Sequence, residues 1–381
     1  GRRVRPELLL AIDQGTTSTR AIAFDRRLHP VAASSIPLAS AHPRPGWVEQ
    51  DPEAILESVV MAVARVLDEV GGVDRIAAVG LDNQGETVVA WEAHSGRALG
   101  PAIGWQCRRS LPLVERLRAA GLESAIHERS GLPLDPYFSA GKLAWLLEHD
   151  DGVRAASGRG TLRFGTVDAW LTARLDGGAA RTDPSTASRT ARLGLRTLAW
   201  DDALLAWFGV ARATLPRIVP SAGDLGVLSH PRWGGRIPLR AMACDQQAAL
   251  AGHAAFSSGA IKATYGTGVF VLANAGDRRD VAPGIETSIA WSLPDGTTAS
   301  VLQGGVFTAG AFIDWLRDAL GLVVDAAETE ALARSVRDAA GVRILPALAG
   351  LGAPWWRPEA RAVVAGLTAA ADRAHVVRAA L

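Results

Sequence analysis

Short apolar runs alternate with apolar residues at helical spacing along the chain. Apolar runs at 7–12 and 20–25 flank a turn rich in Gly, Thr and Ser, which predicts a β-hairpin. Asp51-Pro52 is typical of a helix start, and apolar residues recur at helical spacing from there to Gly71-Gly72. The run 76–81 predicts another buried strand. This alternation of strands and helices predicts an α/β fold with mixed sheets.

A second cycle of the same kind begins near residue 240. The apolar run 239–243 leads into Cys244-Asp245 and an Ala-rich helix. Residues 260–264 and 269–272 then predict two strands around the turn Tyr265-Gly-Thr-Gly268. Two Gly-Thr hairpins far apart in the sequence indicate two related lobes facing one ligand. We predict an N-terminal domain over 1–250 and a C-terminal domain over 251–381.

Composition narrows the range of functions. The 381 residues carry 40 Lys and Arg against 39 Asp and Glu, so the net charge of +1 argues against nucleic acid or an anionic membrane as the main partner. Lys142 and Lys262 are the only lysines, and neither stands in a P-loop or in the β3 motif of protein kinases. The two cysteines form no disulfide framework and suit a reducing cytoplasm. No apolar run reaches the roughly 18 residues of a membrane span.

The two Gly-Thr turns are candidate phosphate sites. Asp13-Gln-Gly-Thr-Thr-Ser18 offers backbone N–H groups and hydroxyls to phosphate oxygens, and Asp13 at the strand end can hold Mg²⁺. Tyr265-Gly-Thr-Gly268 is a second turn of this type. Each turn taken alone also fits an ordinary hairpin, but the pair is more specific.

Other polar residues follow predicted strands. Asp245 stands between a strand and a helix, where it can accept a proton from a substrate hydroxyl, although taken alone an Asp at this place is more typical of a helix N-cap. The segment 83–87 offers polar groups for hydroxyls, and Trp105 and Tyr137 offer aromatic surface. Such residues suit a polyol pocket, because a polyol presents both hydroxyls and C–H edges.

These segments, in this order, resemble the FGGY carbohydrate kinases. The resemblance rests on L-A-I-D-Q-G-T-T-S-T-R-A-I-A-F-D at 10–25, P-G-W-V-E-Q-D-P at 45–52, A-I-G-W-Q-C-R-R at 102–109, Y-F-S-A-G-K-L-A-W-L-L-E-H at 137–149, D-Q-Q-A-A-L at 245–250, Y-G-T-G at 265–268 and G-L-G-A-P-W-W at 350–356. It covers the chain from Leu9 to Leu381.

The resemblance implies two actin-like, ribonuclease H-like lobes around a cleft. It implies transfer of the ATP γ-phosphoryl group, with Mg²⁺, to a polyol hydroxyl, with glycerol as the first candidate. It implies a soluble cytoplasmic enzyme that can form a homo-oligomer. The implied roles are the following: Asp245 as general base; Glu86, Trp105, Tyr137, Asp245, Gln246 and Phe270 at the polyol; Thr16, Thr17, Ser18, Arg20, Thr267 and Gly310 at the nucleotide; and Asp13 at the metal.

The chain departs from the family pattern in three places. Members that phosphorylate glycerol usually read N-Q-R-E-T, where this chain has Gly85, and a usual Gln is Asp314 here. Gly85 would leave space for a larger polyol, unless Arg108 or Arg109 fills the gap. The family also continues for roughly another hundred residues, so an incomplete second lobe is expected. The alternatives are therefore a kinase for a larger polyol or sugar, and a non-catalytic, truncated polyol-binding fragment.

Overall fold

The computed structural model describes residues 7–266, 268–348, 350–357 and 359–381. They form two compact units. The first comprises the described residues through Gly259 together with Asn274–Val281 and Thr287–Val301, and the second comprises Ala260–Ala273, Ala282–Glu286 and Leu302–Leu381. Among the described residues, none of the helices has the length and apolar character needed to cross a membrane.

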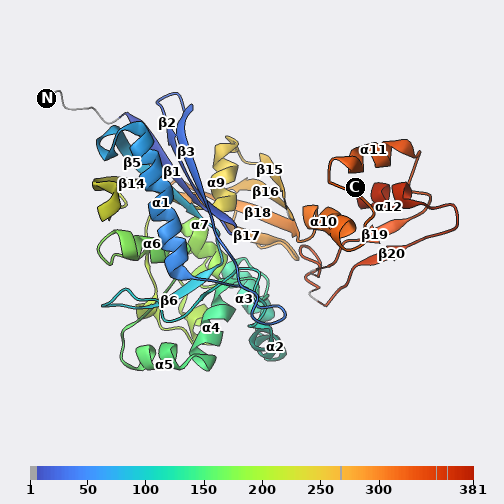
Figure 1. Cartoon of the computed structure of the whole chain (residues 1–381). Helices are drawn as coiled ribbons and strands as arrows, with labels where there is room; N and C mark the ends of the chain where they lie inside the picture. Colours follow the sequence, from blue (N-terminus) through green and yellow to red (C-terminus); the bar gives the residue numbers. More distant parts are fainter. Residues whose placement is uncertain (1–6, 267, 349, 358) are drawn as a thin grey trace. The chain divides into compact units, whose positions relative to one another are not determined.

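A six-stranded sheet forms the centre of the first unit (Figure 1). Its strands, in spatial order, are β13 (Val227–His230), β14 (Gly235–Cys244), β5 (Ile76–Asn83), β1 (Leu8–Gln14), β2 (Ser18–Phe24) and β3 (Pro30–Pro37). β1 and β14 both run parallel to β5, whereas β2 is antiparallel to β1. The carboxyl ends of β1, β5 and β14 therefore lie at one edge of the sheet, where α/β proteins bind ligands.

Helix α1 (Pro52–Val70) covers one face of this sheet beside β2 and β3 (Figure 1). The Asp51 side chain caps its N-terminus by accepting from Glu53 N, and Gly71, at φ 87°, ends it. The apolar face of α1, which includes Ile55, Val59 and Val63, is fully buried against the sheet. The sequence pattern predicted this helix and both of its ends, and the structure confirms them.

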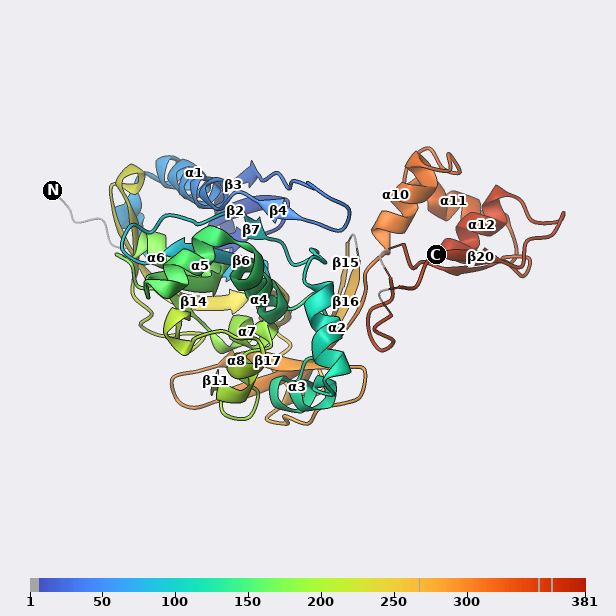
Figure 2. The same cartoon turned by 90° about the horizontal axis from the view of Figure 1, so that it is seen from below.

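A second sheet in this unit has the order β4 (Glu49–Gln50), β7 (Ala102–Ile103), β6 (Val88–Glu92) and β8 (Leu162–Thr166). Helices surround it: α2 (Leu111–Ala119), α3 (Glu123–Ser130), α4 (Ser139–His149), α5 (Asp151–Gly158), α6 (Val167–Leu175), α7 (Pro184–Ala187), α8 (Asp202–Trp207) and α9 (Asp245–Gly252). Figure 2 shows α4, α5 and α6 next to β6. The short 3₁₀ helices η1 (Val73–Arg75), η2 (Ser188–Thr190), η3 (Arg212–Thr214) and η4 (Pro231–Trp233) also belong to this unit. Two further strand pairs are β9 (Arg181–Thr182) with β12 (Arg217–Ile218) and β10 (Leu193–Gly194) with β11 (Ala199–Trp200).

The C-terminal part of the chain begins with a hairpin. β15 (Ile261–Tyr265) pairs antiparallel with β16 (Val269–Gly276), and both belong to a sheet with β18 (Thr298–Val306) and β17 (Glu286–Ser292). The remaining elements are α10 (Gly310–Asp318), α11 (Glu328–Ser335), α12 (Arg373–Ala380) and the pair β19 (Arg343–Leu345) and β20 (Val363–Ala365).

The structure confirms both predicted hairpins and the strand that leads into Asp245. Sequence patterns did not single out α3 and α5. α3 has only two buried residues, Ile126 and Ser130, so its sequence carries little of the apolar spacing that reveals α1. The predicted boundary at 250/251 stays a prediction.

Candidate active site

Three carboxylates gather where β1, β5 and β14 end. Asp13 on β1 is in register with Asp82 on β5, so the two side chains lie on the same face of adjacent parallel strands. Asp245 directly follows β14, whose last residue, Cys244, is in register with Asn83. Asp245 is the first residue of α9, and Cys244 is its N-cap. The explanation of Asp245 as a helix N-cap is therefore wrong, because Cys244 occupies that position and the Asp245 carboxylate does not cap the helix.

The electrostatics of this edge are unusual for aspartates. Burial, together with the nearby charges of Asp13 and Asp245, raises the pKa of Asp82 well above its ordinary value. Burial, followed by the charge of Glu86, raises the pKa of Asp245 to about 6. Asp82 Oδ1 is buried and has no hydrogen-bond partner among the described residues. Sequence reasoning missed Asp82, although it stands one residue before Asn83, at the end of the same strand.

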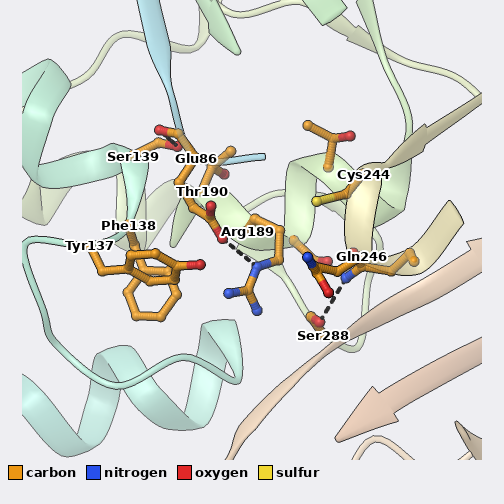
Figure 3. Close-up of polar contacts among 12 residues, drawn as sticks. Glu86, Tyr137, Phe138, Ser139, Arg189, Thr190, Cys244, Gln246 and Ser288 are labelled. Atoms are coloured by element: carbon orange, nitrogen blue, oxygen red, sulfur yellow. Dashed lines mark hydrogen bonds and ion pairs between the residues drawn. The ribbon is translucent and has the colours of Figure 1, made fainter. Parts of the chain in front are cut away.

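Glu86 is held by a buried arginine. Arg189, from η2, donates through Nε to Glu86 Oε1 at 2.7 Å, and both side chains are almost fully buried. Figure 3 shows the two side chains pointing toward one another, with the rings of Tyr137 and Phe138 to one side. The Arg189 guanidinium lies 5.7 Å from the Tyr137 ring centroid and 5.4 Å from that of Phe138. Sequence reasoning did not identify Arg189.

Trp105 and Tyr137 form an aromatic wall. Their rings meet edge to face, with 5.6 Å between centroids and an interplanar angle of 89°. The buried Lys142 holds the loop of Tyr137, because its Nζ donates to the carbonyl of Pro136 at 2.8 Å and to the carbonyl of Tyr137. Burial lowers the pKa of Lys142 to about 8. The predicted polyol residues Glu86, Trp105 and Tyr137 are thus brought together in the first unit.

The first phosphate turn joins β1 to β2. Gly15 N donates to Ser18 O at 3.0 Å, which closes the turn around Thr16 and Thr17. Arg20 on β2 lies opposite Asp13 on β1. The predicted phosphate and metal residues of this hairpin therefore lie next to the three-carboxylate edge.

The remaining predicted nucleotide residues belong to the second unit. Thr267 lies outside the described residues. Gly310 is the first residue of α10, and its N–H donates to Gly266 O at 3.0 Å, which joins that helix to the β15–β16 turn. Phe270 lies on β16, where a Cβ at Gly305 would come within 2.8 Å of its ring.

The backbone at Gly85 lies close to the thiol of Cys244. Its φ is +67°, and a Cβ placed there would lie 3.1 Å from Cys244 Sγ. Arg109 is committed elsewhere, since it pairs with Glu49 at 2.7 Å and lies 3.8 Å from the ring centroid of Trp47. The Cys244 thiol therefore bounds the space beside Gly85, and Arg109 does not fill it.

Comparison with known proteins agrees with this geometry. Glycerol kinases of Thermus brockianus and Geobacter sp. are 49% and 47% identical to the chain over 98% of its length and 76% of theirs. The crystal structure of Plasmodium falciparum glycerol kinase with ADP superimposes with a TM-score of 0.90 at 31% identity, covering 98% of this chain and 75% of that one. A ligand-bound xylulose kinase from Lactobacillus acidophilus, with a TM-score of 0.86 at 22% identity, shares the fold.

The family comparison covers both halves of the chain. Residues 8–252 match the N-terminal domain of the FGGY family of carbohydrate kinases, and residues 261–381 match its C-terminal domain. The expectation of an incomplete second lobe is not borne out, because both domains of the family are matched. The chain therefore belongs to the FGGY family of carbohydrate kinases.

Proposed function

We propose that the protein transfers the γ-phosphoryl group of ATP to a terminal hydroxyl of glycerol, giving glycerol 3-phosphate and ADP. The observation that carries the proposal is Asp245. It stands at the carboxyl edge of three parallel strands, free of the N-cap role and next to the buried Glu86–Arg189 pair. Relatives named glycerol kinase, similar over 98% of this chain, support the choice of glycerol.

Asp245 acts as the general base. With a pKa raised to about 6, its carboxylate is ionised near neutral pH and still basic enough to accept a proton. As the glycerol oxygen attacks the γ-phosphorus, the O–H proton passes to Asp245. The new O–P bond forms while the bond to the ADP oxygen breaks, so ADP carries away the displaced electron pair.

The polyol is held by polar groups and aromatic faces. Glu86, fixed by Arg189, accepts hydrogen bonds from hydroxyls, and Gln246 offers an amide beside Asp245. Trp105 and Tyr137 cover the C–H edges of the carbon chain. Phe270, on β16, is assigned to the polyol from the family resemblance alone.

Thr16, Thr17, Ser18 and Arg20 of the first hairpin bind nucleotide phosphate, and Thr267 and Gly310 are assigned to the nucleotide from the family resemblance alone. The residues present also fit Mg²⁺. Asp13 would hold it, because its carboxylate lies in register with Asp82, whose buried Oδ1 has no partner among the described residues. Although three aspartates lie at this edge, no three His, Cys, Asp or Glu side chains of the described residues are arranged so that they could hold one metal ion together. Mg²⁺ commonly takes only one or two carboxylates plus substrate phosphates, and there it neutralises phosphate charge.

Gly85 supports a second candidate, a kinase for a longer polyol. Apart from the two chain neighbours of Gly85, Cys244 Sγ is the only atom of the described residues within 4 Å of a Cβ placed there. A hydroxyl of a four- or five-carbon polyol can then occupy the place of the side chain that Gly85 lacks, on the near side of the thiol. The two buried free thiols, Cys107 and Cys244, favour a reducing, cytoplasmic setting for either activity.

The test is a comparison of kcat/KM for glycerol, erythritol and the pentitols in an assay that measures ADP release. Phosphorus NMR identifies the product, and a reaction without polyol measures background ATP hydrolysis. We expect glycerol to lead and glycerol 3-phosphate to form. A longer polyol in the lead would overturn glycerol in favour of the second candidate. ADP release that does not depend on any polyol would overturn both.

A further inference from the structure

The first phosphate turn is held from outside by side chains of distant segments. Gln50 Nε2 donates to Thr16 O at 2.7 Å. Gln84 Nε2 lies 3.0 Å from Gln14 Oε1 and 3.0 Å from Gln50 Oε1, and all three glutamines are buried. The start and the middle of the turn are therefore held by amide groups that do not belong to the hairpin.

Trp105 joins this network through its polar edge. Its indole Nε1–H donates to Thr16 Oγ1 at 2.9 Å, and its backbone N–H donates to Thr87 Oγ1 at 3.1 Å. The same ring packs edge to face on Tyr137. Trp105 thus links the aromatic wall to the phosphate turn through one direct contact.

The direction of that hydrogen bond matters for the Thr16 hydroxyl. A threonine hydroxyl has one proton and two acceptor lone pairs, whereas an indole N–H can only donate. Because Thr16 Oγ1 accepts from Trp105, its own proton is left to point elsewhere. A phosphate oxygen on the other side of the turn is a strong acceptor for such a proton, since hydrogen bonds to ionised acceptors are the stronger class.

We propose that Trp105 is a positioning residue for nucleotide binding: its indole N–H orients the Thr16 hydroxyl as a donor to nucleotide phosphate. This inference rests on the proposed function, in which Thr16 binds phosphate and Trp105 faces the polyol. It has one consequence beyond the role of an aromatic wall. A polyol that fixes the indole also fixes Thr16, so polyol and nucleotide bind cooperatively, and linkage makes the effect equal in both directions.

The test uses the full chain with Trp105→Phe. Phenylalanine keeps an aromatic face toward the polyol and toward Tyr137 but has no N–H. Calorimetry with the non-hydrolysable analogue AMP-PNP and Mg²⁺, with and without glycerol, measures nucleotide affinity. We expect affinity to fall about two- to tenfold, the change that corresponds to one neutral hydrogen bond. We also expect the KM for ATP to rise with little change in the KM for glycerol, and the gain in affinity caused by glycerol to shrink.

Four further variants separate this proposal from general damage. Thr16→Val should lose at least as much affinity as Trp105→Phe, and the double variant should lose no more than Thr16→Val, because the indole acts only through the Thr16 hydroxyl. Thr16→Ser, which keeps the hydroxyl, should retain more affinity for AMP-PNP than Thr16→Val. Trp145→Phe is the matched control, because Trp145 packs on Trp47 and His149. The affinity of this variant for AMP-PNP should equal that of the unaltered chain.

Two results would overturn the proposal. One is unchanged AMP-PNP affinity in Trp105→Phe, and the other is fully additive losses in the double variant. Affinity measured without polyol tests the hydrogen bond even if glycerol proves not to be the substrate. Failure of the proposed function would instead appear in the unaltered chain, as the absence of glycerol-dependent ADP release.

Discussion

The two halves of the site in the first unit are built from different chemistry. Around the proposed polyol position stand ionisable groups, namely Asp82, Asp245 and the pair Glu86–Arg189. The phosphate turn at residues 14–18 is instead held by neutral amides, hydroxyls and an indole, with contacts such as Gln50 to Thr16 O and Trp105 to Thr16 Oγ1. Both halves meet at the ends of β1 and β5.

This difference matches two tasks, since the charged half serves proton transfer and the neutral half holds hydrogen-bond donors in fixed directions. A proton acceptor needs a pKa suited to its task, and burial among like charges supplies it at Asp245. A turn that binds an anion needs donors with fixed directions and no negative charge of its own, and neutral amides supply those. Substitutions in the charged half should therefore change rate, pH dependence and stability strongly, while those in the neutral half should change nucleotide affinity by modest factors.

The largest expected effect is the loss of the base. Asp245→Asn keeps the shape of the side chain but removes its proton-accepting charge. We expect kcat to fall about 10²- to 10⁴-fold while glycerol still binds, measured by steady-state kinetics and by calorimetry with glycerol. A fall of less than tenfold would place the base elsewhere and would remove the proposed contrast between the two halves.

The second effect concerns stability. Arg189→Met leaves the Glu86 carboxylate buried without its ion pair, which costs about 3–5 kcal/mol in the free energy of unfolding. Urea unfolding followed by circular dichroism measures this cost. The matched control is Arg129→Met, which breaks an ion pair with Asp201 whose arginine side chain is 48% exposed. That exposed pair should contribute about 1 kcal/mol or less.

If Arg189→Met and Arg129→Met lower the free energy of unfolding equally, the buried Glu86–Arg189 pair contributes no more to stability than an exposed pair. A second variant separates charge from packing. Glu86→Gln combined with Arg189→Met leaves no buried charge at this pair, so it should recover part of the stability lost in Arg189→Met alone.

The local parts of this site could be predicted from sequence, and the long-range contacts could not. The hairpin around Thr16, the strand into Asp245 and the cap at Asp51 each depend on neighbours in sequence. Arg189 and Glu86 are 103 positions apart, and Trp105 and Thr16 are 89 positions apart. Their pairing depends on how sheets and loops pack, which no local pattern specifies.

Gly85 illustrates the same limit in a different way. Its identity suggested an open space, since glycine has no side chain. The positive φ and the Cys244 thiol 3.1 Å from a would-be Cβ follow only from the packing of β5 against β14. The same holds for Asp82, whose importance comes from its register with Asp13 on the neighbouring strand.

The third effect is a pH dependence confined to the charged half. Burial raises the pKa of Asp245 to about 6, so its ionised form is disfavoured in the folded protein. Asp245 therefore contributes to the free energy of unfolding while it is protonated. This contribution is fully present below the ordinary aspartate pKa near 4 and is lost as the pH rises through about 6. Activity has the opposite sign because the base must be ionised. We expect kcat/KM for glycerol to fall about tenfold per pH unit below 6.

Trp105→Phe serves as the control for this pH profile. It removes the hydrogen bond to Thr16 and leaves Asp245 unaltered, so its acidic limb should lie at the same pH as in the unaltered chain. A limb that moves with Trp105→Phe, or an acidic limb that persists unchanged in Asp245→Asn, would mean that another group controls the profile.

The smallest effect is expected at Gly85, where the two halves touch. Gly85→Ala places a side chain at φ +67° with its Cβ 3.1 Å from Cys244 Sγ. The left-handed conformation alone costs a residue with a side chain about 1–2 kcal/mol, and urea unfolding measures the total. In the background of Cys244→Ala, which removes the sulfur, the cost should shrink to the conformational part. If Gly85→Ala destabilises equally in both backgrounds, the thiol does not bound this space.

The same pair of variants decides how polyol length should be probed. Gly85→Arg would combine strain with any new hydrogen bond, so the unstrained probe of a larger pocket is Cys244→Ala alone. A rise in kcat/KM for erythritol relative to glycerol in that variant would show that the thiol limits polyol length, and an unchanged ratio would place the limit elsewhere in the site.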